Sequence, residues 1–187
     1  MYETASGLTR TWAEAVLRQL KLVKEKRDVW HYYSVELDMG GEWCLPAIRA
    51  TFRELWSAEH ALVWMAYQMQ KWVTRLGQEA AGDPHRSYIA EKLDTSEDGL
   101  LRDLRNALEH LNEAHFADSR AVPPAIKGKR SWSLKRLPKQ SLWIALGHHK
   151  LFGLIDLDVL EQRARAILKV LDAEIGPWEQ RIVESTL

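Results

Sequence analysis

The stretch RNALEH, at positions 105–110, carries three side chains whose types could act on a phosphate group. Arg105 is always charged, and its planar guanidinium can bind two phosphate oxygens at once. Histidine is the side chain that titrates near neutral pH, so His110 could take up or release a proton during a reaction. Asn106 precedes His110 by about one helical turn and could orient it or hold a phosphate. Spacing alone favours the simpler alternative, which is the solvated face of an amphipathic helix.

A helix with clear start signals is expected to carry these residues, from a cap at Thr95 or Ser96 to about His115. Glu97 and Asp98 favour the positively polarised N-terminal end of this helix. At about 100° per residue, its apolar residues fall within about 60° of the central one and predict a single core stripe. The stripe consists of Leu100, Leu101, Leu104, Ala107, Leu108 and Leu111.

The three polar residues lie off this stripe. Measured from Leu104, Arg105 lies at about 100°, Asn106 at about 200° and His110 at about 240°. Arg105 can pair with Glu109 one turn later, which stabilises an exposed helix by about 0.2–0.5 kcal/mol. The pattern therefore satisfies both a functional interpretation and a purely structural one.

Three further helices are predicted from apolar residues at three-to-four spacing. The first covers residues 6–28, with WHYYSVELDM either extending it or breaking from it, and Gly40–Gly41 ending whatever precedes them. The second runs from Pro46 to about Leu76, followed by a loop at 77–87 and a short helix at SYIAEKL. The last starts at a capping box formed by Asp158 and Glu161 and runs to about Ile175, where Gly176–Pro177 interrupts it.

Residues 118–155 differ from the rest and are expected to form an insertion. Residues 118–140 carry three Pro and a cluster of bases, which indicates a long loop with a strand at SWSLKRL. The apolar runs in SLWIALGHHKLFGLI predict a hairpin around Gly147–His148–His149. The whole chain, 1–187, is thus predicted to be one all-α domain. Its expected architecture is an up-and-down bundle of four to five helices, with a small β-hairpin insertion before the last long helix.

Composition narrows the class of protein. Of the 187 residues, 46% are hydrophobic and 28% are charged, as in ordinary globular domains. Lys plus Arg equals Asp plus Glu, at 26 each, which argues against nonspecific coating of nucleic acid. The single cysteine, Cys44, excludes an intrachain disulfide and a cysteine metal cluster. The start MYETASGLTRTW has no secretory signal pattern, and no apolar run reaches the roughly 20 residues of a membrane span, so a cytoplasmic protein is expected.

The motif and its helical setting resemble the HEPN family (higher eukaryotes and prokaryotes nucleotide-binding). The signature of that family is an Arg and a His separated by four to six residues, often with Asn directly after the Arg. Arg105, Asn106 and His110 fill those positions with four residues between Arg and His, and the predicted bundle extends the resemblance over most of residues 6–175. The hairpin region is not part of the minimal core of the family.

The resemblance implies a metal-independent endoribonuclease that needs no cofactor and acts as a homodimer. The ribose 2′-hydroxyl would attack the adjacent phosphate, leaving a 2′,3′-cyclic phosphate and a 5′-hydroxyl. His110 would transfer protons, Arg105 would stabilise the phosphate, and Asn106 would orient His110 or hold the phosphate. Such enzymes serve as toxins of toxin–antitoxin or phage-defence systems, and a nucleotidyltransferase antitoxin is an expected partner.

The helical angles add a requirement for two copies. Arg105 and His110 lie about 140° apart around an ideal helix, so one copy cannot easily bring both to one phosphate. Two copies related by a twofold axis could place both sets of side chains in one groove. Two alternatives stay open. One is a noncatalytic HEPN-like module that binds a nucleotide or a protein, and the other is a helical protein in which the motif is coincidental.

Other candidate sites are weaker. The basic segment IKGKRSWSLKRLPK could bind RNA, with Trp132 as a stacking surface, or could form a solvated hairpin. The candidate RNA contacts are Arg102, Lys129, Arg130, Trp132, Lys135 and Arg136. His148–His149 lacks neighbouring acidic or cysteine ligands, so no metal site is predicted there.

Overall fold

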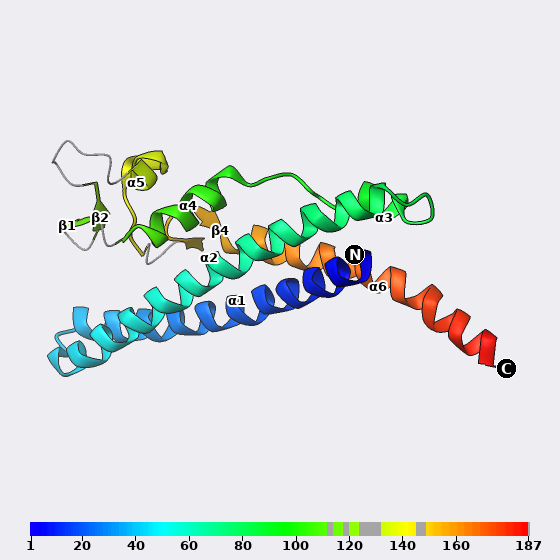
Figure 1. Ribbon diagram of the computed structural model, residues 1–187. Coiled ribbons are helices and arrows are strands. Elements are labelled where there is room, and N and C mark those ends of the chain that lie inside the picture. Colours follow the sequence, from blue (N-terminus) through cyan, green and yellow to red (C-terminus); the bar gives the residue numbers. More distant parts are fainter. Residues whose placement is uncertain (112–113, 118–119, 124–131, 145–148, 187) are drawn as a thin grey trace.

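Two long helices are the largest elements of the protein in a computed structural model. The structure describes residues 1–111, 114–117, 120–123, 132–144 and 149–186. Helix α1 (Tyr2–Asp38) and helix α2 (Leu45–Ala81) are joined by the short turn η1 (Glu42–Cys44) and pack as an antiparallel hairpin (Figure 1). Helix α6 (Leu157–Thr186) packs against α1, and its C-terminal end extends beyond the N-terminus of the chain. The predicted all-α bundle is confirmed.

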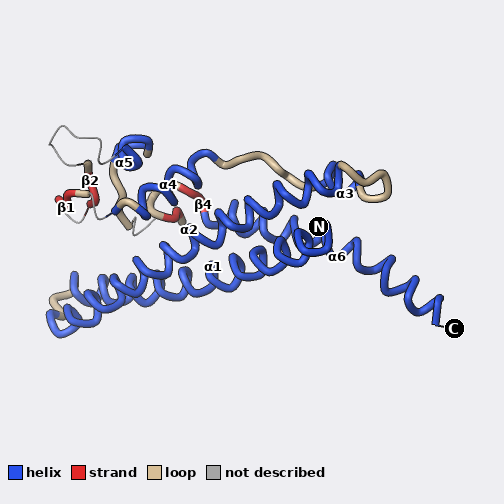
Figure 2. The backbone as a smooth tube through the Cα atoms, in the orientation of Figure 1, coloured by secondary structure: helices blue, strands red, loops and turns tan. Residues whose placement is uncertain are grey.

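Several short elements pack on α2, and residues 94–96 among them also contact α6 through Arg163. Helix α3 (Ser87–Lys92) and helix α4 (Gly99–Glu109) both pack on α2, and α5 (Trp132–Arg136) packs on α4. The described strands are confined to the region between α4 and α6 (Figure 2). None of the described helices combines the length and the apolar content needed to cross a bilayer.

The core follows the predicted apolar stripes. On α4 the residues Leu101, Leu104, Ala107 and Leu108 are buried, while Leu100 and Leu111 are partly buried and pack against the same cluster. This matches the stripe expected around Leu104. The α4 stripe meets α2, so the polar face of α4 is oriented by packing rather than by its own hydrogen bonds.

Both long helices of the hairpin exceed their predicted bounds. WHYYSVELDM continues α1 to Asp38, and α2 ends at Ala81 instead of near Leu76. Gly77 lies inside α2 because the chain packs closely there: a Cβ on Gly77 would lie 2.6 Å from Cγ2 of Thr95. The glycine therefore serves a close approach between segments and does not end the helix. The short helix expected at SYIAEKL is α3.

Helix α4 is shorter than predicted at both ends. Its cap is Asp98, whose Oδ1 accepts the Leu101 N–H at 3.0 Å, so the caps predicted at Thr95 and Ser96 are wrong. It ends at Glu109 with His110 as the C-cap, and does not reach His115. The reason lies in strand pairing, because β1 (His115–Ala117) pairs antiparallel with β2 (Arg120–Val122) and needs extended backbone.

The insertion also differs from its prediction. SWSLKRL contains helix α5 instead of a strand, followed by η3 (Pro138–Gln140), and Leu134 and Leu137 are buried at helical spacing. Leu142 pairs with Ala121 of β2, with N···O distances of 2.9 and 3.0 Å, and is not part of a hairpin with the next apolar run.

The second hairpin is β3 (Lys150–Leu151) with β4 (Ile155–Asp156), and its turn is Phe152–Gly153–Leu154. The predicted small β-hairpin before the last long helix is thus confirmed. Of the turn residues predicted for it, Gly147 and His148 lie outside the described residues, and His149 directly precedes β3. Gly153 has φ +70°, a conformation that glycine adopts without strain.

The start and end of the last helix also correct the prediction. Oδ1 of Asp156 accepts the backbone N–H of Asp158 at 2.9 Å and caps α6, so the capping box at Asp158 and Glu161 is wrong. The backbone of α6 continues through Gly176–Pro177 to Thr186 without the predicted interruption.

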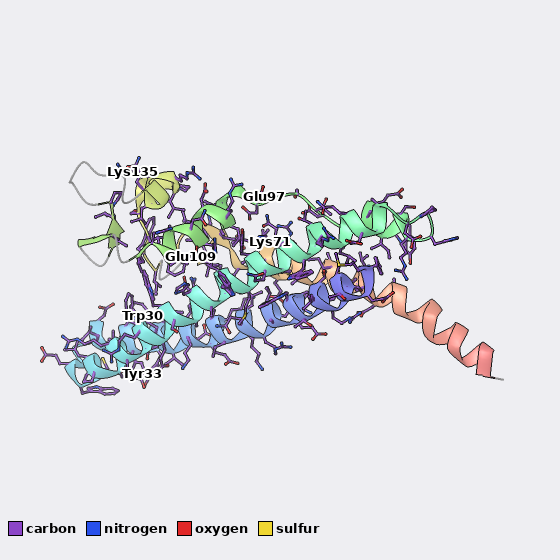
Figure 3. All side chains as sticks on the ribbon, in the orientation of Figure 1. Trp30, Tyr33, Lys71, Glu97, Glu109 and Lys135 are labelled. Carbon is purple, nitrogen blue, oxygen red and sulfur yellow. The ribbon has the colours of Figure 1, made fainter. Side chains whose placement is uncertain are left out.

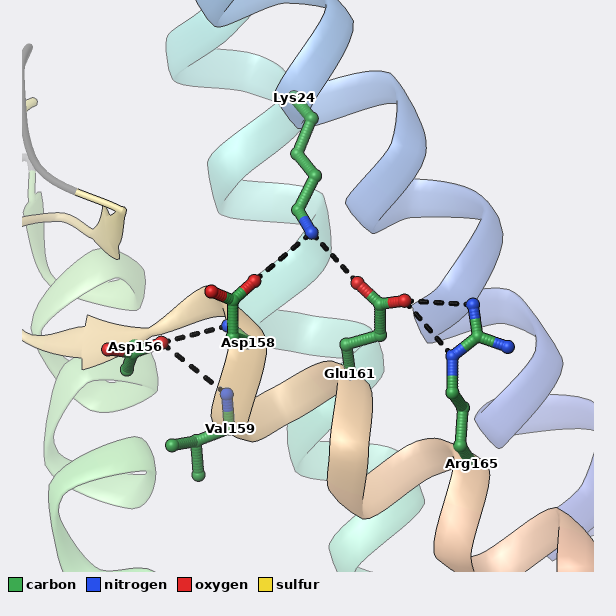
Figure 4. A network of polar contacts seen from close by, with 6 residues as sticks. All are labelled: Lys24, Asp156, Asp158, Val159, Glu161 and Arg165. Carbon is green, nitrogen blue, oxygen red and sulfur yellow. Dashed lines mark hydrogen bonds and ion pairs between the residues drawn. The ribbon is translucent and has the colours of Figure 1, made fainter.

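Asp158 and Glu161 instead bind α1 (Figure 4). The Lys24 ammonium donates to Asp158 Oδ1 at 3.2 Å and to Glu161 Oε2 at 2.8 Å, and Arg165 also donates to Glu161. The hydrogen bond from Lys24 is the main cause that lowers the pKa of Glu161, and the same bond raises the pKa of Lys24. This network holds the first turn of α6 against α1.

A buried ion pair anchors the β3–β4 hairpin. Glu59 of α2 is fully buried, pairs with Arg27 of α1 and accepts the Phe152 N–H at 2.8 Å. Arg27 also donates to the Lys150 carbonyl at 2.8 Å, and the Phe152 ring lies edge-on to Trp56 with centroids 5.0 Å apart. Burial raises the pKa of Glu59, and Arg27 opposes that rise. The hairpin is therefore joined to both long helices through one carboxylate.

Candidate functional site

Arg105 lies where α4 crosses α2. Its guanidinium carbon is 5.2 Å from the Trp64 ring centroid and 5.1 Å from the Tyr67 ring centroid, both on α2. These distances are typical of cation–π contacts, in which the electron-rich ring face attracts the cation. The buried stripe of α4 holds the two helices together and so brings Arg105 to these rings.

Polar contacts fix the same guanidinium. Nη2 of Arg105 pairs with Glu109 one turn later, and Nη1 donates to Asn106 Oδ1 at 3.0 Å. Each terminal nitrogen carries two N–H groups, and each of these contacts uses one of them. One N–H on each nitrogen is therefore not used by Glu109 or Asn106. Nε of Arg105 is buried and has no hydrogen-bond partner among the residues that the structure describes. The side chain as a whole is 24% exposed, which leaves its outer edge accessible.

His110 occupies the end of α4 and not its middle. It is the C-cap, with φ −103° and ψ 22°, and its backbone N–H donates to the Asn106 carbonyl at 3.2 Å. Its side chain is exposed. Arg105, Asn106 and His110 thus occupy the last turn of α4, where the chain leaves the helix toward β1. Asn106 Oδ1 accepts a hydrogen bond from Arg105 Nη1, so the Asn106 amide orients the arginine.

The candidate RNA contacts are partly engaged elsewhere. Arg102 pairs with Glu97 at 3.0 Å, and both Arg102 and Arg136 approach Asp103 Oδ1 at 3.8 Å. Asp103 therefore links α4 to α5. Lys135 is exposed on α5. Lys129 and Arg130 lie outside the described residues, as does the side chain of Trp132, the first residue of α5.

The aromatic neighbours of Arg105 are functional candidates that the sequence analysis did not identify. Measured from the buried Leu62, Tyr67 lies at about 140°, Lys71 at about 180° and Trp64 at about 200° around α2. Trp64 and Lys71 therefore lie on the face opposite the core, and Trp64 is 40% exposed, whereas Tyr67 is partly buried and packs at the edge of the core. Lys71 lies 5.6 Å from the Tyr67 ring centroid, and Figure 3 labels Lys71 on α2 beside the α4 residue Glu109. An angular count of α2 could have found this face, but not its contact with Arg105.

A second cluster of cations and an aromatic ring lies in the insertion. Arg120 and Lys139 lie over the Trp143 ring, with the charged groups 5.4 and 5.3 Å from its centroid. The Ala121–Leu142 pairing fixes Trp143 beside β2, which follows α4 closely in the chain. Trp143 is therefore a second tryptophan, besides Trp64, that the structure places against basic side chains.

No group of three His, Cys, Asp or Glu side chains in the described part of the chain is arranged to hold a metal ion. The site therefore consists of an arginine, an amide, an imidazole and aromatic rings. Such groups can bind a phosphate, stack on a base and transfer a proton.

No protein-family model, curated protein or solved structure matches the chain.

Proposed function

We propose that the chain is a HEPN-like, metal-independent endoribonuclease that acts as a homodimer. The observation that carries the proposal is the fixed position of Arg105, which two α2 rings and Asn106 hold in the turn that presents His110. A held arginine loses little conformational freedom when it binds a phosphate, so it can stabilise the charge that develops in the transition state.

The proposed reaction needs one base and one acid. The 2′-oxygen loses a proton to an imidazole and attacks phosphorus, while the bond from phosphorus to the 5′-oxygen breaks. The leaving oxygen takes a proton, giving a 2′,3′-cyclic phosphate and a 5′-hydroxyl. In a twofold dimer the His110 side chains of the two copies can divide these roles, and the Arg105 guanidinium stabilises the phosphorane oxygens.

The exposed part of Trp64 supports an RNA substrate in particular. It borders Arg105, so a nucleotide whose phosphate meets the guanidinium can place a base on the indole ring. Base–aromatic stacking contributes about 1–3 kcal/mol per base and tolerates different sequences. Trp143 with Arg120 and Lys139 offers a second contact for the same strand.

The biological setting belongs to the same proposal. We expect a cytoplasmic enzyme that degrades cellular or phage RNA as a toxin or defence effector, with a nucleotidyltransferase antitoxin as its partner.

One contact favours a second candidate, a noncatalytic HEPN-like module that binds a nucleotide or a protein. Glu109 is 38% exposed and pairs with Arg105 on the side where a phosphate would bind. A phosphate must therefore displace or share this carboxylate. If Glu109 keeps the guanidinium neutralised, the groove binds ligands without cleaving them.

An RNA cleavage assay in EDTA tests the proposal. We expect cleavage by the wild type, and a loss of at least about a hundredfold in His110→Ala, since general acid–base catalysis contributes about 10²–10⁴. Arg105→Lys keeps the charge but loses the bidentate fork, so it should also reduce the rate. His85→Ala, an exposed histidine in the loop before α3, is the matched control and should cleave normally.

The products and the oligomer complete the test. The 3′ ends should be cyclic phosphates, and the active species should sediment as a dimer. Cleavage that His110→Ala leaves intact contradicts the assignment of the site. RNA binding without cleavage, weakened by Arg105→Lys, favours the noncatalytic module.

A further inference from the structure

Where α1 approaches the turn that leads into α2, its side chains are not buried. The buried residues of α1 end at Val23, and none of its side chains from Lys24 to Asp38 is buried. This segment nevertheless contains a run of apolar and aromatic residues, VWHYYSV, at 29–35. Trp30 and Tyr33 are labelled near this end in Figure 3. We call residues 28–48 the hairpin tip.

The start of α6 explains why the tip is uncovered. Lys24 binds the first turn of α6, and Arg10 pairs with Asp172 further along it at 2.7 Å, so α6 runs from Lys24 toward the N-terminus of α1. Beyond Arg27, which is tied to the β3–β4 hairpin, α1 packs mainly against α2 and the turn η1 in the described part of the chain. The tip therefore projects as a two-helix arm.

An exposed apolar face follows from this arrangement. Among the described residues, half of the large hydrophobic side chains that are exposed belong to the tip, and Met39 and Trp43 are the most exposed of these, at 69% and 66%. The tip members are Val29, Tyr32, Val35, Met39 and Trp43. The helical members recur at three-to-four spacing and span about 120° of one face. Exposed apolar side chains that gather on one face in this way mark a candidate interaction site.

The charge of the tip is one-sided. Residues 28–48 contain four acidic residues and neither Lys nor Arg, in a chain with a formal net charge of zero. The acidic residues are Asp28, Glu36, Asp38 and Glu42. No ion pair within the described residues neutralises any of them. Arg49 and Arg53, which are exposed, follow the tip on α2, so the tip carries an excess of negative charge that these two arginines offset only in part.

The exposed apolar face and the acidic residues beside it together indicate the chemistry of the partner. Nucleic acid and anionic lipid are repelled by the carboxylates, and a second copy docked about a twofold axis would bring two acidic tips together. A cationic protein segment with an apolar face matches both properties. We propose that the hairpin tip docks a cationic amphipathic helix of a partner protein, with aliphatic side chains on Tyr32, Met39 and Trp43 and with Lys or Arg against the carboxylates. The proposal does not depend on RNA cleavage.

A binding assay with defined peptides tests the proposal. The probe is a fluorescent helical peptide with a leucine face bordered by arginines, and the reference carries glutamates in place of the arginines. In fluorescence anisotropy against the full chain, the arginine peptide binds at least about tenfold more tightly, and added salt weakens it. The glutamate peptide shows no binding.

Substitutions at the tip test whether the peptide binds there. Glu36→Gln/Asp38→Asn/Glu42→Gln weakens the arginine peptide about tenfold and flattens its salt dependence. Tyr32→Ser/Met39→Ser weakens it by a similar factor. Tyr88→Ser/Glu91→Gln on α3 alters an exposed aromatic residue and an exposed acid elsewhere and leaves binding unchanged. All replaced side chains are at least partly exposed, so circular dichroism should report the wild-type fold.

The opposite results overturn the proposal. If both peptides bind equally tightly, charge plays no role in the binding. If the α3 control variant loses as much affinity as the tip variants, the peptide does not bind at the tip. A wild-type dimer that Tyr32→Ser/Met39→Ser dissociates in sedimentation makes a second copy the occupant. Binding of RNA or of anionic vesicles that the same variant abolishes assigns the tip to those ligands instead.

Discussion

Removal of the Glu59 carboxylate should destabilise the fold more than removal of any exposed acid. Glu59 is fully buried, pairs with Arg27, whose side chain is only 14% exposed, and accepts the Phe152 N–H. Glu59→Ala leaves a cation and an N–H without their buried acceptor. Breaking a buried ion pair costs about 3–5 kcal/mol, because the remaining charge stays desolvated.

The size of the loss can be read from thermal or urea unfolding. For a chain of this length each kcal/mol shifts Tm by about 2–4 °C, so Glu59→Ala should lower Tm by about 6–20 °C. Glu59→Gln keeps an acceptor for the Phe152 N–H and should lose less. Arg27→Met/Glu59→Leu removes both charges and should recover part of the loss, since apolar replacements of buried pairs are often tolerated.

An exposed pair on the same two helices provides the control. Glu54 of α2 pairs with Lys26 of α1 and is 55% exposed, so Glu54→Ala should change the free energy of unfolding by less than about 1 kcal/mol. The reasoning is refuted if Glu59→Ala costs no more than Glu54→Ala. It is also refuted if the double replacement is worse than the sum of the two single ones.

Three further predictions concern local interactions. The pKa of Glu161 is lowered by Lys24, so the folded state binds fewer protons there than the unfolded state. The contribution of Glu161 to the free energy of unfolding is present above the ordinary glutamate pKa and is lost as pH falls through the lowered value. Lys24→Met should therefore reduce the dependence of stability on acid pH, measured by urea unfolding. An unchanged pH profile would count against the Lys24–Glu161 contact. Asp98→Ala removes the cap of α4 and should cost about 1 kcal/mol in the free energy of unfolding, whereas no loss would mean that the cap is dispensable. Gly77→Ala gains about 1 kcal/mol of helix propensity but meets Thr95 Cγ2, so it should stabilise the protein more in a Thr95→Ser background than in the wild type, and equal effects in both would contradict the close approach.

Local patterns in the chain were sufficient for much of the helical architecture. The stripe around Leu104, the short helix at 87–92 and the all-α class all follow from residues a few positions apart, and packing reproduces them. A helix face is defined by nearest neighbours along the chain, so its periodicity is visible before any tertiary contact exists.

The ends of elements were harder to predict, because several neighbouring side chains compete to cap each helix and other contacts engage some of them. Ser96 and Asp98 are both good caps, but the Ser96 hydroxyl is bound to Asp94, and Asp98 takes the cap. Asp158 fits a capping box by spacing, but Asp156 caps α6 and Asp158 turns to Lys24. Several local solutions were available in each case. A neighbouring residue engaged Ser96, and a long-range contact with Lys24 engaged Asp158.

The sequence by itself determined which residue types stand in the last turn of α4. Arg105, Asn106 and His110 follow one another at fixed spacing whatever the fold does around them. Only the tertiary structure decided that Arg105 lies against Trp64 and Tyr67, about 40 residues earlier in the chain, and that His110 ends the helix. The physical reason is that the sequence states the type of each side chain directly. The neighbours of a side chain depend instead on how whole helices pack, and a short segment does not contain that information.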